Sequence, residues 1–334
     1  MLFTRINSII LCFLVLGSLP VLAQGSEKKV LVVESYHKEM YWDAGYREGI
    51  LQTIGGYASV TFFEMDTKRL PRSSFQARAE AAIATIDQLQ PDIVMLGDDN
   101  ALSLVGKAVL NRKIPLVFLG INGNPRNYFD GGLPAGITGV LERPLLKRAL
   151  RFIREINPDW TEVLILFDDS NTARIYRDSP FFFAGSNHKR ILGLNVEIYL
   201  SNSYEDLQAK VKQAQTDKHV LFLGGLHTLT DQHNQHVNGD IATSWIYQHS
   251  EIPMFGFWKG TVGIDKTIGG YVIDGHSMGA QAARQVLHVL EGETTKRVKI
   301  EWLFEGRLVL SPSALKRWDI VIPKRLSEKA EYMD

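Results

Sequence analysis

Short apolar stretches alternate with helix-like segments along almost the whole chain, and this alternation restricts the possible fold more than any other feature. Residues 30–33 form a run of aliphatic, mostly β-branched side chains, typical of a strand that is covered on both faces. Residues 73–89 then place apolar side chains three and four positions apart, as an amphipathic helix does. Repetition of this order predicts an α/β protein with parallel sheets and helices on both faces.

The alternation runs through two rounds. In the first round we expect strands at 30–33, 59–63, 93–96 and 114–119, with helices at 46–53, 73–89 and 101–110. In the second we expect strands at 163–167, 196–200, 220–223 and 253–257, with helices at 145–156, 175–192, 204–215 and 238–248. Two rounds in 334 residues predict two doubly wound lobes of ordinary domain size.

The last part of the chain is too short to form a third domain. A strand at 271–274 leads into a helix at 278–290, and short strands and a brief helix at 313–317 follow before residue 323. No flexible, low-complexity linker separates the two rounds. We therefore expect this part to complete the two lobes, and several hinge strands to join them.

The first residues have the pattern of a secretory signal peptide. One cation, Arg5, precedes an apolar run at 9–16, and small residues around Ala23 supply a cleavage site. The run is shorter than the roughly 20 residues that a membrane-spanning helix needs. We predict a signal peptide at 1–23, cleavage near Ala23 and a periplasmic protein; an uncleaved anchor is the alternative. The single cysteine, Cys12, lies inside this segment, so the mature chain would have no disulfides.

The overall charge indicates no large charged partner. The chain has 37 basic and 37 acidic residues, so it creates no broad field that would attract nucleic acid or an anionic membrane. We expect a monomer that binds a small molecule.

Polar and aromatic side chains recur where the expected strands end, which is where open parallel sheets bind ligands. Such residues can also cap the following helix, so capping is the alternative for any one of them. Together they suggest a small-molecule cleft. The predicted ligand-binding residues of the first lobe are Ser35, Tyr36, Trp42, Asp99, Asn100 and Asn122, and those of the second are Asp169, Ser170, His227 and Trp258.

Two pairs of adjacent aspartates stand at these strand ends. The pairs Asp98–Asp99 and Asp168–Asp169 could receive an ammonium group or sugar hydroxyls. In each pair we expect one member to be only a helix cap, and the sequence leaves open which one.

Several stretches resemble a known family. The first half contributes VVESYH at 32–37, MDTK at 65–68, GDDNAL at 97–102 and PLVFLGIN at 115–122. The second half contributes MGAQAA at 278–283, LVLS at 308–311 and WDIVIP at 318–323. With these motifs the chain resembles the ABC-transporter substrate-binding family with the type I periplasmic-binding-protein fold. Similar modules form the extracellular parts of sensor kinases.

The resemblance implies a topology and a non-catalytic role. It implies one lobe at 28–137 plus 273–299, a second at 138–272 plus 300–334, and a three-segment hinge near 138–139, 272–273 and 300–301. It also implies a small-molecule ligand and a membrane partner, either an ABC permease or a sensor receptor such as a histidine kinase.

Two more specific interpretations, a serine hydrolase and a metal site, have weaker support in the sequence. The sequence around Ser277 matches the G-x-S-x-G pattern of serine hydrolases, but only His288 follows it. Eleven residues of helix would separate the two by about 16 Å, too far for catalysis. Three histidines, His227, His233 and His236, could suggest a metal site, but a polar, solvated helix explains the last two better. We predict no metal and no cofactor, since the glycine-rich loops match no nucleotide fingerprint.

Overall fold

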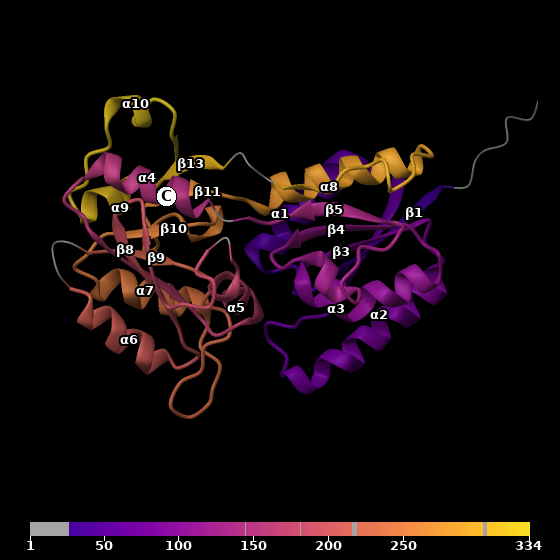
Figure 1. The fold of residues 1–334 in the computed structure, drawn as a ribbon, viewed down its shortest axis with the longest axis horizontal. Coiled ribbons are helices and arrows are strands. Elements are labelled where there is room, and N and C mark those ends of the chain that lie inside the picture. Colours follow the sequence, from indigo (N-terminus) through magenta and orange to yellow (C-terminus); the bar gives the residue numbers. More distant parts are fainter. Residues whose placement is uncertain (1–26, 144, 181, 216–218, 303–305) are drawn as a thin grey trace, which may run out of the picture.

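The protein folds into two lobes that lie side by side (Figure 1). The computed structural model describes residues 27–143, 145–180, 182–215, 219–302 and 306–334. The predicted signal peptide at 1–23 lies outside the described residues. None of the described helices combines the length and the apolar character needed to cross a membrane.

Lobe one contains a six-stranded sheet in the order β12-β5-β4-β3-β1-β2, and every neighbouring pair is parallel. Its helices are α1 (Tyr41–Ile54), α2 (Phe75–Leu89), α3 (Asp98–Asn111) and α8 (Gly275–Leu290). Its strands are β1 (Lys28–Glu34), β2 (Ala58–Glu64), β3 (Ile93–Gly97), β4 (Leu116–Ile121), β5 (Ile137–Leu141) and β12 (Glu301–Trp302), and the 3₁₀ turns η1 (Arg72–Ser74) and η2 (Pro125–Tyr128) lie in its loops.

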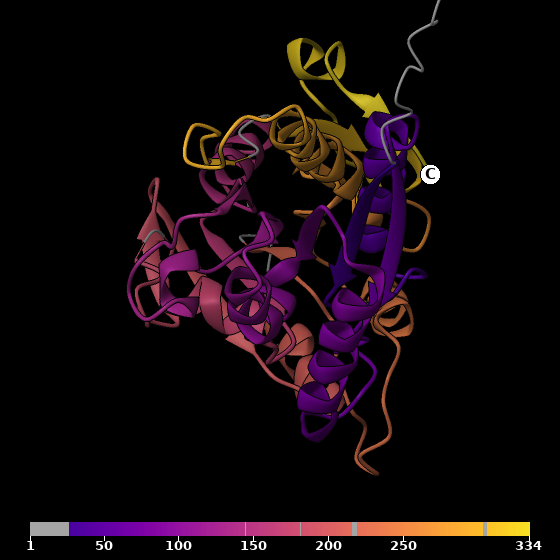
Figure 2. The ribbon, with the colours of Figure 1, turned by 90° about the vertical axis from the view of Figure 1, so that its right-hand side faces the viewer.

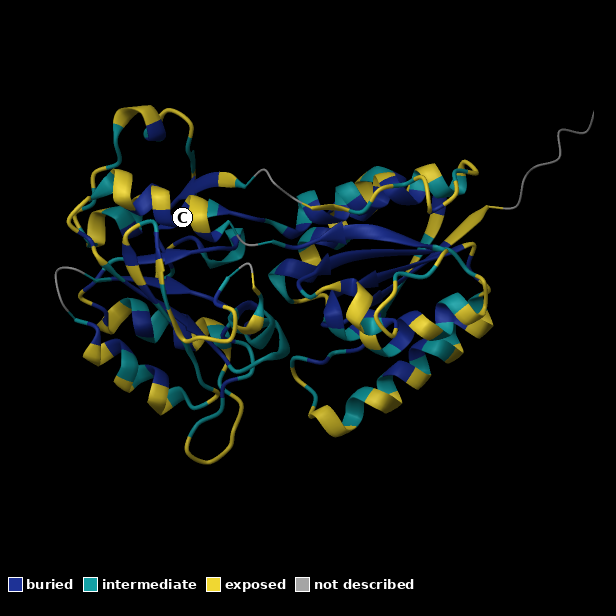
Figure 3. Ribbon diagram, viewed as in Figure 1, coloured by how far each residue is buried: buried dark blue, intermediate teal, exposed yellow. Residues whose placement is uncertain are grey.

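The residue pattern of β1 explains why helices cover both faces of this sheet. Val30 and Val32 point into the core with α1 and α8, whereas Leu31 and Val33 point into the core with α2 and α3. All four side chains are fully buried. Figure 2 shows α8 on one side of the sheet and α2 on the other, and Figure 3 shows the strands as the buried layer between half-exposed helices.

Glycines let α1 and α8 approach each other closely. A Cβ atom at Gly275 would overlap the carbonyl oxygen of Trp42, and one at Gly279 would overlap that of Tyr46. Helix α8 begins with an Asp274 cap, whose Oδ1 accepts a hydrogen bond of 2.8 Å from the Ser277 backbone N–H. The glycines of the G-x-S-x-G match therefore serve helix packing.

Lobe two repeats the same plan around a five-stranded sheet in the order β10-β9-β6-β8-β7. Only the edge strand β7 is antiparallel. On β6, Val163 and Ile165 share the core with α4, and Leu164 and Leu166 share the opposite core with α6 and α7. The elements are β6 (Glu162–Phe167), β7 (His188–Ile191), β8 (Leu194–Leu200), β9 (His219–Leu223), β10 (Met254–Gly256), η3 (Lys259–Thr261), α4 (Leu146–Ile156), α5 (Asn171–Asp178), α6 (Tyr204–Gln213) and α7 (Gly239–His249).

A small third sheet, in the order β11-β13-β14, joins lobe two. It consists of β11 (Gly269–Val272), β13 (Arg307–Leu310) and β14 (Glu331–Tyr332), with the short helices α9 (Pro312–Arg317) and α10 (Lys324–Ser327) between the last two strands. The segment from β13 onward thus adds to lobe two.

Three connections join the lobes: β5 to α4, β11 to α8, and β12 to β13. The structure keeps β5 in the lobe-one sheet as far as Leu141, a few residues beyond the predicted crossing at 138–139. Likewise β12 still pairs with β5, so the third crossing follows Trp302. Glu142 is consequently the first residue after the sheet at one crossing.

Two secondary-structure predictions were wrong. The helix expected at 175–192 ends at Asp178, and the chain returns as the edge strand β7, whose backbone bonds to β8 replace the helical ones. The expected polar helix around His233 and His236 is a loop between β9 and α7, held by an Asp231 side chain that accepts from the His233 and Gln235 backbone N–H groups.

Candidate functional site

A cavity of about 40 Å³ lies between the lobes, where strands of both sheets end. Aromatic and polar side chains line it, and no single lobe supplies them all. Lobe one contributes Tyr36, Met40, Tyr41, Trp42, Lys68, Asp98 and Asn122, the hinge contributes Glu142, and lobe two contributes Phe167, Ser170, Thr172, Gly225, His227 and Trp258.

Glu142 joins the two lobes at the hinge side of this cavity. Its Oε1 accepts a hydrogen bond of 2.9 Å from the Trp258 indole N–H and one of 3.3 Å from the Tyr176 hydroxyl. Its Oε2 accepts from the Asn122 side-chain amide at 3.4 Å, and the Tyr176 hydroxyl also donates to Asn122 Oδ1. Burial raises the pKa of Glu142 to about 7, although the donors from Trp258 and Tyr176 oppose this shift.

Asp98 carries the second carboxyl of the cavity. It is 2% exposed, its Oδ2 has no hydrogen-bond partner among the described residues, and its backbone has φ +65°. Burial, followed by the nearby carboxyls of Asp43 and Glu142, raises its pKa well above the usual value. The Trp42 indole nitrogen, also in the cavity wall, is likewise buried without a partner in the described part of the chain.

The remaining polar groups of the cavity are less buried. The Lys68 ammonium lies 4.8 Å from the centre of the Tyr36 ring, a cation–π contact. The His227 ring lies 6.3 Å from that of Tyr41 across the lobes. Burial, with a further contribution from the charge of Lys68, lowers the pKa of His227 to about 4, so this side chain is neutral at neutral pH.

Of the ten residues predicted from the sequence, six line the cavity: Tyr36, Trp42, Asn122, Ser170, His227 and Trp258. Ser170 also caps α5 by accepting from the Ala173 backbone N–H at 3.4 Å. Their role in binding stays a prediction.

The other four predicted residues lie outside the cavity lining and make local contacts instead. Ser35 Oγ donates to the Gly97 carbonyl at 2.6 Å and accepts from the Ala101 N–H at 2.8 Å, which fixes the start of α3. Asp99 accepts from the Asn122 and Gly123 backbone N–H groups at 3.0 Å. Asn100 donates to Thr67 at 2.9 Å, and Asp169 pairs with Arg174.

The expected helix cap was wrong for both aspartate pairs, because Gly97 and Ser170 occupy the N-caps of α3 and α5, and one member of each pair holds a loop backbone instead. In the first pair Asp98 lines the cavity, while Asp99 holds the loop after β4. In the second pair Asp168 accepts from the His227 and Thr228 backbone N–H groups at 2.8 and 3.0 Å, and Asp169 lies in a polar groove at the edge of the lobes.

The sequence reasoning missed Glu142, which lines the cavity, and Tyr176, which bonds to Glu142 from lobe two. Glu142 follows β5, a strand end that the predicted hinge position at 138–139 concealed. Tyr176 lies within α5, five residues after the strand-end motif, and its hydroxyl reaches back to the hinge. Lys68, which was part of a quoted motif, was not singled out.

The described residues support neither the serine-hydrolase interpretation nor the metal-site interpretation. Ser277 Oγ donates to Asp274 at 3.0 Å, and His288 lies near Glu293 at the far end of α8. No group of three or more potential metal ligands occurs among the described residues.

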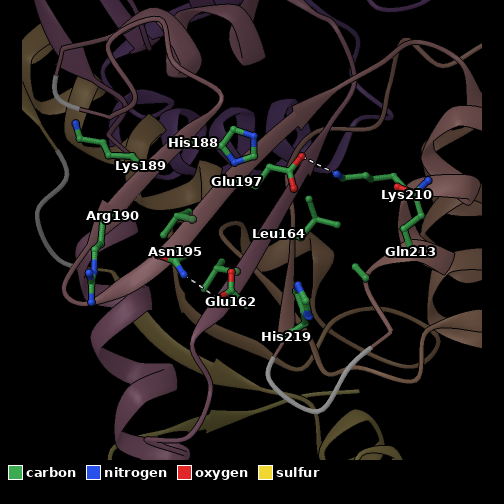
Figure 4. A pocket seen from close by; sticks show the side chains of 13 residues that line it. Glu162, Leu164, His188, Lys189, Arg190, Asn195, Glu197, Lys210, Gln213 and His219 are labelled. Carbon is green, nitrogen blue, oxygen red and sulfur yellow. Dashed lines mark hydrogen bonds and ion pairs between the residues drawn. The ribbon is translucent and has the colours of Figure 1, made fainter.

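A larger hollow of about 670 Å³ lies on lobe two over β6, β7 and β8 (Figure 4). Two pairs of its side chains bond to each other: Lys210 with Glu197 at 2.6 Å, and the Asn195 amide with Glu162 at 2.7 Å. Both pairs are visible in Figure 4. Because this hollow lies on one lobe, closure of the two lobes would not enclose a molecule in it, and we do not regard it as the ligand site.

Comparison with known proteins agrees with this geometry. A structure from Streptococcus pneumonia, described as the ABC domain in complex with L-Trp, is similar with a TM-score of 0.65 and 16% identity over 92% of this chain and 100% of that one. A conserved domain protein from Vibrio cholerae has a TM-score of 0.64 and 16% identity, covering 92% and 99%. The open, ligand-free substrate-binding protein CD0873 from Clostridium difficile has a TM-score of 0.63 and 12% identity, covering 91% and 98%.

These similarities show the type I periplasmic-binding-protein fold with two lobes. No curated protein matches the chain. The model of the family described as ABC transporter substrate binding protein matches residues 67–333. The chain therefore belongs to the ABC transporter substrate-binding protein family.

Proposed function

We propose that this protein captures a small polar or aromatic molecule between its lobes, in the periplasm, and delivers it to the permease of an ABC transporter. The observation that carries the proposal is the interlobe cavity, two of whose lining residues hold a buried polar atom without a partner among the described residues, Asp98 Oδ2 and Trp42 Nε1. Buried polar groups are normally hydrogen-bonded, so unpaired ones in the residues that line a cavity suit a bound ligand.

The hinge contacts support capture by closure. Tyr176 and Trp258 from lobe two donate to Glu142, so the lobes are in contact around the cavity. A ligand that touches both lobes favours the closed arrangement by its differential affinity for it. Proteins of this fold have been solved with L-Trp and, from Agrobacterium vitis, with alpha-D-tagatopyranose, so the fold accepts chemically different small molecules.

A thermal-shift screen of the mature protein against a metabolite library tests the proposal. A ligand should raise the melting temperature in a concentration-dependent way, and Trp258→Ala should abolish that rise. Gln213→Ala, in the hollow on lobe two, is the matched control and should leave the rise intact. If the ligand stabilises Trp258→Ala as well as the wild type, it binds elsewhere and the proposed site is wrong.

Uptake measurements test delivery to the permease. Cells that lack the gene should lose uptake of the ligand found in the screen, and restoring the gene should restore uptake. An unchanged uptake together with a lost signalling response would assign the protein to a sensor receptor instead.

A further inference from the structure

The unpaired polar atoms of the cavity define what its ligand must carry. Asp98 Oδ2 lacks a hydrogen-bond donor, and the Trp42 indole N–H lacks an acceptor, within the part of the chain that the structure describes. Both side chains approach Gly120: a Cβ there would lie 3.1 Å from Asp98 Oδ1 and 3.5 Å from Trp42 Nε1. A ligand that satisfies both needs a donor and an acceptor a short distance apart.

The backbone holds Asp98 in an unfavourable conformation at this place. Its φ of +65° lies in the left-handed region, which non-glycine residues seldom adopt. Strain of this kind persists where the surroundings impose it, and it concentrates at ligand sites. Here it holds a residue of the cavity lining whose buried Oδ2 atom receives a hydrogen bond from no described group.

The charges around Asp98 make the site deficient in positive charge. Burial raises the pKa of Asp98, and the carboxyls of Asp43, Glu142 and Asp99 raise it further. Lys68, the cation in the cavity lining, opposes this shift, but among the described residues it forms no ion pair with Asp98 and lies over the Tyr36 ring. A ligand with positive charge would compensate the ionised form of Asp98.

The size and walls of the cavity limit the rest of the ligand. Its volume of about 40 Å³ holds about three water-sized groups, so the closed lobes accommodate a compact molecule. The rings of Tyr36, Tyr41 and Trp258 line the walls, and aromatic faces attract cations.

We propose that the ligand is a compact amine of net positive charge, whose protonated nitrogen binds Asp98 and whose hydroxyl oxygen accepts from the Trp42 indole N–H. This inference rests on the proposed function, because it assigns the ligand class of the same cavity. A neutral polyol or a zwitterionic amino acid would leave the excess of carboxyls uncompensated.

A matched set of small probes tests the charge requirement. Ethanolamine, ethylene glycol and glycolate share a short carbon chain and a hydroxyl but end in a cationic, a neutral and an anionic group. Glycine supplies a zwitterion of similar size. Titration calorimetry should show ethanolamine binding at least tenfold more tightly than ethylene glycol, and more tightly than glycine. Equal binding of ethanolamine and ethylene glycol, or tighter binding of glycine, would overturn the inference.

Variants at Asp98 test where the nitrogen binds. Asp98→Asn should weaken amine binding at least tenfold, because a hydrogen bond to a carboxylate becomes one to a neutral amide. Asparagine tolerates the left-handed conformation, so the variant should fold; Asp98→Gly, which relieves the strain, is a second variant for the same comparison. Asp130→Asn, on the exposed surface, is the matched control and should bind as the wild type does. Unchanged binding by Asp98→Asn would show that the nitrogen binds elsewhere.

Proton release gives a readout that a structural role of Asp98 would not produce. Because the empty site favours protonated Asp98, binding of a cation should release a proton. Calorimetry in two buffers of different ionisation enthalpy should detect this release in the wild type and not in Asp98→Asn. If the wild type releases no proton on binding, the proposal that the cation binds Asp98 is wrong.

The metabolite screen separates failure of this inference from failure of the proposed function. If the library yields cavity ligands that are neutral or anionic and bind Asp98→Asn normally, the ligand class is wrong and capture between the lobes stands. If no compound in the library or in the probe set stabilises the wild type, both proposals fail.

Discussion

The two lobes contribute different chemistry to the cavity between them. Lobe one and the adjoining hinge supply every ammonium and carboxyl group of the lining: Lys68, Asp98 and Glu142. Lobe two supplies aromatic rings, hydroxyls, a glycine and His227, which is neutral because its pKa is lowered to about 4. The comparison suggests that a charged ligand is recognised on lobe one and the hinge, and that closure of lobe two adds neutral contacts.

The largest expected effect comes from removing the main ring of lobe two. Trp258 is 6% exposed and packs on Phe167 and Tyr176, with ring centroids 6.1 and 6.3 Å from its own. Trp258→Ala should lower the free energy of unfolding by about 3–5 kcal/mol, since it leaves a cavity. Urea unfolding followed by circular dichroism measures the loss. Trp245→Ala, on a partly exposed ring of α7, is the control, and an equal loss there would contradict the packing argument.

The next effect should come from the charge at the hinge. Glu142 has its pKa raised from 4.5 to about 7, so the native state binds its proton more tightly than the unfolded state. Its contribution to stability is complete below about pH 4.5 and is lost as the pH rises through 7. Glu142→Gln should remove this decline. Compared with acidic pH, the unfolding free energy of the variant near pH 8 should rise by up to about 3 kcal/mol relative to that of the wild type.

The geometry of the hinge favours this substitution. Trp258 and Tyr176 both donate to Oε1, and a glutamine oxygen can accept both bonds. Only the 3.4 Å contact of Oε2 with the Asn122 amide would become unfavourable. Urea unfolding over a series of pH values measures how the free energy of unfolding changes with pH. An equally steep change in Glu142→Gln and in the wild type would assign the pH dependence to another group.

A smaller effect should follow from loss of one hydroxyl between the lobes. Tyr176→Phe removes the donor to Glu142 and Asn122 and should cost about 1 kcal/mol in unfolding free energy. It should also move the pH transition of Glu142 upward, because a hydrogen bond to the carboxylate is lost. Tyr128→Phe, whose hydroxyl donates to Asp99 at 2.6 Å within lobe one, is the matched control. Only the first variant should move that transition.

The last effect, which appears on the acid side, should come from His227 on lobe two. Its pKa is lowered from 6.5 to about 4, so between these values the unfolded state binds a proton that the native state does not. Stability is therefore lost as the pH falls from about 6.5 towards 4, the opposite direction to Glu142. His227→Gln should reduce this acid-side decline of the melting temperature. His233→Gln, exposed on the same loop, is the control, and an equal change there would contradict the assignment.

Sequence reasoning could predict the strands because their buried faces leave a strong pattern. The run at 30–33 is apolar on both faces since α1 and α8 cover one side and α2 and α3 the other. The edge strand β7 has no such pattern: of its four residues only Ile191 is buried. An edge strand is specified by backbone pairing with β8, which a sequence periodicity does not reveal.

The cavity residues that the sequence predicted are those close to a strand end. Tyr36, Asn122 and Trp258 directly follow or lie within two residues of β1, β4 and β10, and strand ends were where the search looked. Tyr176 reaches the hinge residue Glu142 from the second turn of a helix, so only the three-dimensional packing identifies it. Ser35, Asp99 and Asn100 also stand at strand ends, but the start of α3 and the loop after β4 need their hydrogen bonds.

The late position of α8 in the chain has a consequence for folding. This helix packs against α1 and covers one face of the lobe-one sheet, yet residues 142–274, most of lobe two, come before it. An emerging polypeptide would therefore display the Val30 and Val32 side of its first sheet with α1 as its cover and without α8 until nearly the whole chain is available. The amino-terminal half cannot mature alone, and a chain held extended until its synthesis is finished would avoid aggregation through that apolar surface.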